Sequence, residues 1–126
     1  MKYAINGLGI PEAIGPYSQG TTAGRLVFAS GQLAYDPDDS TKLVGATVAE
    51  QTERTIDVIE TILAEVGCGL SDVAQTTVYL ADINDMDEMN AVYARRFLPP
   101  APARAVVAVS ALPMGALVEM DCVACR

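Results

Sequence analysis

Apolar residues recur every three or four positions over residues 48–66, which predicts an amphipathic helix. Thr47 and Glu50 open this segment as a capping box, and Gly67 is placed to end it. The inner stripe consists of Val48, Thr52, Thr55, Ile56, Ile59, Ile62, Leu63 and Val66. Acidic residues occupy much of the remaining surface, which indicates that the opposite face is solvated.

A second helical pattern begins at Asp82 or Asp85 and is stopped by Pro99 and Pro100. Its inner stripe consists of Met86, Met89, Asn90, Tyr93 and Phe97. Asn90 places an amide on an otherwise apolar stripe. A satisfied structural amide is the simplest interpretation of that position.

Short apolar or alternating runs predict five strands. The first covers residues 25–29, and a second short strand ends at Tyr35. The other three cover residues 73–80, 104–109 and 117–124. The predicted order is β-β-α-β-α-β-β, an α+β single domain over residues 1–126. The last two strands are apolar on both faces, as in a sheet that is covered on two sides. Because two helices cover only one face, we expect a second subunit to pack its sheet against the other.

Composition narrows the function classes. The chain has 126 residues, of which 51% are hydrophobic, and no histidine. The missing histidine excludes Ser-His-Asp and Cys-His catalysis and argues against a catalytic metal. A net charge of −8 argues against nucleic acid as a partner, because that binding depends on cationic contacts. The mean hydropathy of +0.27 favours apolar surface buried between subunits.

Three cysteines, Cys68, Cys122 and Cys125, and the absence of a signal peptide favour a reducing cytoplasm. Cys122 and Cys125 have C-x-x-C spacing, but they lie in a strand-like run, where positions three apart face opposite sides. Two small buried residues are therefore a better interpretation than a redox or zinc motif. Prolines and Arg104 interrupt the long apolar run after Phe97, so no membrane span is expected.

Arg104 is the only charged residue between Phe97 and the end of that run at Glu119. A guanidinium in an apolar stretch requires an anion, and arginine grips carboxylates with two parallel hydrogen bonds. Taken alone, Arg104 is more often a structural salt bridge, with Glu119 as its partner. The alternative is an anchor for a substrate carboxylate.

Four segments in register resemble the Rid/YjgF family, the reactive-intermediate deaminases also called endoribonuclease L-PSP or translation inhibitors. The segments are Ile14–Gly20 (IGPYSQG), Ala29–Gln32 (ASGQ), Met89–Tyr93 (MNAVY) and the stretch from Pro102–Arg104 (PAR) to Val118–Met120 (VEM). The resemblance covers nearly the whole chain. It implies a chorismate-mutase-like α+β fold assembled as a homotrimer, with clefts between neighbouring subunits.

The resemblance also implies cofactor-free hydrolysis of 2-imino acids, such as 2-iminobutanoate and 2-iminopropanoate, to 2-keto acids and ammonia. Carried over by position, Arg104 binds the substrate carboxylate, Glu119 handles the attacking water, and Tyr17 completes the catalytic set. Ser30, Gly31, Asn90 and Val106 are the expected substrate-binding residues. Relatives suited to imine hydrolysis usually have Cys where Val106 stands, which leaves the substrate range open. No cofactor or metal is expected.

Elementary chemistry agrees with these roles. A fixed guanidinium orients a carboxylate, and one carboxyl group with a raised pKa can both accept and return a proton. Two other functions stay open. One is a trimer that binds small carboxylates such as 2-keto acids without turnover. The other is an RNase or translation inhibitor, which the net charge of −8 disfavours.

Overall fold

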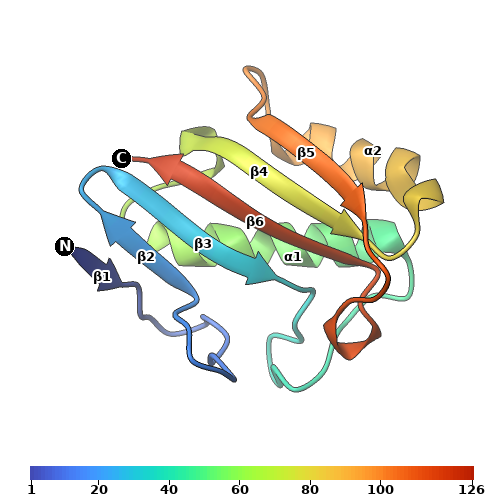
Figure 1. Ribbon diagram of the computed structural model, residues 1–126, viewed down its shortest axis with the longest axis horizontal. Helices are drawn as coiled ribbons and strands as arrows, with labels where there is room; N and C mark the ends of the chain where they lie inside the picture. The colour runs from blue at the N-terminus through green and yellow to red at the C-terminus, as the bar shows by residue number, and fades with distance from the viewer.

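The computed structural model describes residues 1–126 as one mixed sheet with two helices against one face (Figure 1). The strands lie in the order β1-β2-β3-β6-β4-β5, and only the β4–β5 pair is parallel. The elements are β1 (Lys2–Ala4), β2 (Gly20–Ala23), β3 (Leu26–Gln32), α1 (Val48–Ala64), β4 (Val73–Leu80), α2 (Met86–Arg96), β5 (Ala103–Ala108) and β6 (Val118–Cys125). The predicted α+β architecture is confirmed.

The N-terminal third differs from the prediction in two respects. β1 and β2 are two strands that the Gly- and Pro-rich composition hid, so together with β3 three strands precede the first helix. The two strands expected up to Tyr35 are one strand, β3, which continues through a β-bulge between Ala29 and Gln32. Tyr35 forms only an isolated bridge with Leu43. A bulge keeps a strand paired across an extra residue, which composition alone does not reveal.

Helix α1 begins and ends as predicted. The Thr47 hydroxyl accepts a hydrogen bond from the Glu50 amide at 3.1 Å. At the other end Gly67 has φ +74°, and the Cys68 amide donates to the Leu63 carbonyl at 3.0 Å. This 6→1 bond around a left-handed glycine is the Schellman stop. The cap and the stop fix the length of the helix that covers the sheet.

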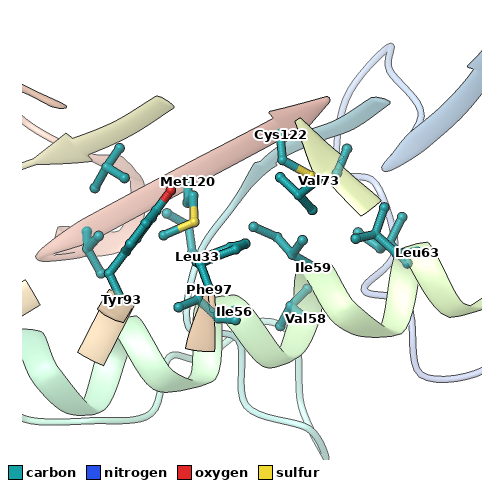
Figure 2. Close-up of a cluster of buried hydrophobic side chains, with 14 of the residues drawn as sticks. Leu33, Ile56, Val58, Ile59, Leu63, Val73, Tyr93, Phe97, Met120 and Cys122 are labelled. Carbon is teal, nitrogen blue, oxygen red and sulfur yellow. The ribbon is translucent and has the colours of Figure 1, made fainter. Parts of the chain in front are cut away.

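The core lies between the sheet and the two helices. Met120 and Cys122 point from β6 toward α1, where they meet residues such as Ile59 (Figure 2). Helix α2 is fixed on the same side by the Tyr93 and Thr76 hydroxyl groups, which are 2.7 Å apart and buried. Cys122 is buried but Cys125 is exposed, so the interpretation of both as small buried residues is wrong for Cys125; positions three apart on a strand face opposite sides.

Ion pairs hold α2 against α1. Arg96 lies 2.7 Å from both Glu53 and Asp57, and Arg95 lies 2.9 Å from Glu53. A network around one arginine constrains the helix more than an isolated surface pair does. It fixes the helix that carries the Asn90 side chain.

The other face of the sheet has no helix over it. Phe28 of β3 stands opposite Val123 of β6 on this open face, and Phe28 is exposed. The expectation that a second subunit covers it stays a prediction. No helix of the chain has both the length and the apolar character that crossing a membrane requires.

Candidate functional site

Arg104 lies on the helix side of the edge strand β5. It is paired with Thr76 in the parallel register, and Thr76 faces α2. The Arg104 side chain donates from Nη1 to the Asn90 Oδ1 at 2.7 Å, and its Cζ lies 4.7 Å from the centre of the Tyr93 ring. The amide on the α2 stripe therefore serves to orient a guanidinium.

Most of the hydrogen-bonding capacity of Arg104 stays free. Only one of its five N–H groups has a partner in the chain, and the side chain is exposed at a shallow groove. That groove is lined by Asn90, Tyr93, Ala94, Phe97, Pro99, Ala101, Pro102 and Arg104. A guanidinium held by an amide and an aromatic ring, with donors to spare, is suited to bind a carboxylate.

Val106 shares the Arg104 side of β5. It is paired with the buried Val78, is itself half-buried and packs against the core. Its side chain therefore contributes apolar packing beside Arg104.

Glu119 lies on the opposite, open face of the sheet. It stands on β6 directly across from Tyr79 of β4, and its side chain lies over Gly31 in the β3 bulge. A methyl group at position 31 would overlap the Glu119 carboxylate. Burial raises the pKa of Glu119, and the charge of Asp121 raises it further. Glu119 is thus a half-buried carboxyl group with an increased affinity for protons.

Ser30, a predicted site residue, joins the Ile14–Gly20 segment to this cluster through both its hydroxyl group and its backbone amide. Its hydroxyl donates to the Ser18 carbonyl at 2.6 Å, and its amide donates to the Gln19 carbonyl at 2.9 Å. The buried Gln32 amide donates to the Gln19 Oε1 at 2.8 Å. These bonds tie the Ile14–Gly20 segment to the β3 bulge, so the two motifs lie side by side in the fold.

Tyr17 is carried by that segment and is 44% exposed. It lies near Tyr35, whose pKa is raised by burial and then by the charges of Tyr17 and Glu119. Tyr17, Tyr35 and Glu119 therefore share one side of the molecule. Of the residues predicted for the site, this cluster collects Tyr17, Ser30, Gly31 and Glu119.

Three residues of the Glu119 cluster were missed from the sequence. Asp121 follows Glu119 by two positions, so its place on the same face could have been read from strand alternation. Tyr79 could not, because its position opposite Glu119 depends on which strand pairs with β6 and in which register. Tyr35 was expected at the end of a strand and not at the site, and the structure places it after β3, where it lies near Glu119.

The chain does not bring Arg104 and Glu119 together, because they lie on opposite faces of the sheet. No ion pair joins them, so the interpretation of Glu119 as the salt-bridge partner of Arg104 is wrong for the single chain. Arg104 and Asn90 form one cluster and Glu119 with Gly31 another. Each cluster is half of the predicted site.

Comparisons with known proteins agree on one family. The model of the family described as endoribonuclease L-PSP matches residues 9–126. A RutC family protein of Pyrococcus abyssi is 45% identical over 90% of this chain and 89% of its own. The human 2-iminobutanoate/2-iminopropanoate deaminase is 43% identical over 90% of this chain and 82% of its own. The crystal structure of the YjgF gene product of E. coli, 35% identical, superposes with a TM-score of 0.90 over 98% of both chains.

Proposed function

Because the chain belongs to the endoribonuclease L-PSP family, the Rid/YjgF proteins, we propose that it hydrolyses 2-imino acids to 2-keto acids and ammonia. The observation that carries this proposal is the 43% identity, over 90% of the chain, to the human protein named 2-iminobutanoate/2-iminopropanoate deaminase. The geometry of the two clusters supplies the groups that such a reaction needs. The 2-iminobutanoate and 2-iminopropanoate class is the substrate class we propose.

The carboxylate of the imino acid binds the free N–H groups of Arg104, and Asn90 holds the guanidinium in place. Glu119 accepts a proton from water as the water oxygen bonds to the iminium carbon. The π-electron pair of the C=N bond moves to nitrogen. Glu119 then returns the proton to that nitrogen. The C–N bond breaks as the Glu119 carboxylate accepts the hydroxyl proton, the keto acid and ammonia are released, and Glu119 passes that proton to water or to the departing ammonia.

The proposed site lies between subunits. Arg104 and Glu119 occupy opposite faces of one sheet, so a substrate that contacts both groups requires Arg104 from one copy and Glu119 from another. The open sheet face and the exposed edge of β5 leave surface available for such contacts. A homotrimer with three equivalent clefts is the assembly we propose.

The family description also names an endoribonuclease. On the open face the carboxylates of Glu119 and Asp121 have no ion-pair partner. Two uncompensated carboxylates repel a phosphate backbone. We therefore propose imine hydrolysis and not RNA cleavage as the activity.

The test generates 2-iminobutanoate in situ from threonine with a pyridoxal-phosphate dehydratase and follows the release of keto acid and ammonia. We expect acceleration over buffer by the wild-type protein and little acceleration by Glu119→Gln. Asp87→Asn, which removes an exposed carboxylate of α2, is the matched control and should keep the wild-type rate. No acceleration by the wild-type protein would overturn the proposal and favour the alternative of a carboxylate-binding trimer.

A further inference from the structure

A second carboxylate accompanies Glu119 on the open face, and the proposed reaction gives it no role. Asp121 lies two residues along β6, so its side chain projects from the same face. The hydroxyl of Tyr79 donates to the Asp121 Oδ2 at 3.0 Å. Tyr79 itself stands directly opposite Glu119. The three side chains therefore form one cluster across the β4–β6 pair.

Every titratable group that faces Glu119 within the chain is an acid. These groups are Asp121 on its own strand, Tyr79 on β4, Tyr35 after β3, and Tyr17 beyond it. No lysine or arginine forms an ion pair with Glu119 or Asp121. Within the single chain these two half-buried carboxylates have no counter-ion, and in the proposed cleft the Arg104 of the neighbouring copy is bound by the substrate carboxylate. The two groups therefore repel each other, and the first proton taken up relieves that repulsion.

The hydrogen bond from Tyr79 to Asp121 gives Asp121 and Glu119 different surroundings. A phenol that donates to a carboxylate favours the charged form of that carboxylate, and Glu119 receives no such bond. The bond to Asp121, together with burial, raises the pKa of Tyr79, so Tyr79 stays the donor at neutral pH. Glu119 is therefore the carboxyl group of the pair that lacks a hydrogen-bond donor within the chain, and it is the one that takes up the shared proton.

We propose that Asp121, held by the Tyr79 hydroxyl, is a positioning residue that directs the proton of this carboxylate pair to Glu119. The catalytic part of this proposal rests on the proposed function. In that reaction Glu119 acts first as a base and then as an acid, and a group with both roles works best when its pKa lies near the working pH. Asp121 touches neither substrate nor water in this role. It acts only through Glu119.

The first experiment does not depend on activity. The side-chain carboxyl of Glu119 is followed by carbon-13 NMR during a pH titration of the full chain and assigned with Glu119→Gln. We expect the midpoint to move to lower pH in Asp121→Asn and to move in the same direction, by less, in Tyr79→Phe. Asp87→Asn makes the same change in net charge and should leave the midpoint in place. An unmoved midpoint in Asp121→Asn and Tyr79→Phe overturns the proposal.

The second experiment measures kcat/KM for imine hydrolysis against pH. Charges two residues apart on a strand are about 6.6 Å apart, so Asp121→Asn should raise kcat/KM on the acid limb roughly threefold if the effective dielectric constant is about 80, and up to roughly 70-fold if it is about 20. A merely structural role would lower the whole profile without moving its limb. If the wild-type protein is inactive, the proposed function fails while the NMR titration still decides the role of Asp121. If Asp121→Asn does not fold, the shift of the Glu119 midpoint in Tyr79→Phe, which keeps the aromatic ring, tests the role of Asp121 in its place.

Discussion

Gly31→Ala should separate activity from stability. Gly31 is extended, with no positive φ, so alanine suits its backbone, but the added Cβ would lie 2.9 Å from the Glu119 Cδ and nearer still to its carboxylate oxygen. Ordinary contacts begin at 3.4 Å. The carboxylate must therefore move by about 1 Å, and a misplacement of that size costs on the order of 100-fold in rate.

The assay compares kcat/KM for imine hydrolysis with the thermal unfolding midpoint. We expect a loss of about 100-fold in kcat/KM with little change in the midpoint, because alanine stabilises a strand by about 0.5–1 kcal/mol relative to glycine and offsets part of the strain. Gly69→Ala is the matched control, since φ at Gly69 is −129° and no atom lies within 4 Å of its Cβ position. It should keep the wild-type activity.

The refuting result is specific. If Gly31 acts by leaving room for the Glu119 carboxylate, the substitution should cost almost nothing further in a Glu119→Gln background. An equal loss in both backgrounds, or a Gly31→Ala protein with most of its activity, would show that the glycine has another role.

Three further predictions test Arg104 as the carboxylate anchor, the charge of Glu119, and the packing of Ile59 in the core. Arg104→Lys should lower kcat/KM about 10- to 100-fold at an unchanged unfolding midpoint, because lysine lacks the paired donors; a comparable loss in Arg95→Lys would contradict this. The pKa of Glu119 is raised in the folded protein, so its charged form costs stability. This cost is absent below about pH 4.3, the ordinary Glu pKa, and is fully present once the pH exceeds the raised pKa. Glu119→Gln should therefore raise the unfolding midpoint at neutral pH but not at pH 4, and the reverse pattern would refute the shift. Ile59→Ala should cost about 2–5 kcal/mol in urea unfolding, since Ile59 is fully buried; a cost below about 1 kcal/mol would contradict its packing.

The sequence predicts correctly those elements whose ends are set by residues within or next to them. Helix α1 has its cap at Thr47 and its stop at Gly67, and β4 has the predicted bounds of 73–80. The N-terminal strands could not be predicted in the same way. β1 and β2 are three and four residues long and lie among Gly and Pro, so their existence depends on pairing with one another and with β3.

The sequence names candidate site residues but not their layout, and the roles of those residues stay predictions. Arg104, Asn90, Glu119 and Gly31 each lie where a functional role is chemically reasonable. Which face of the sheet each side chain occupies depends on register between strands distant in sequence, and a one-residue slip reverses the answer. A single sequence does not contain that register, so the separation of Arg104 from Glu119 emerged only from the fold.

The alternation along β6 sets limits on how this chain can change. Met120, Cys122 and Ala124 are buried, while Glu119, Asp121 and Val123 between them are only half-buried. Substitutions at the latter positions can alter the chemistry without disturbing the packing. Inserting or deleting a single residue would instead exchange the two sets and drive both carboxylates into the apolar layer. Within this strand, evolution can therefore proceed by replacement but not by a change in length.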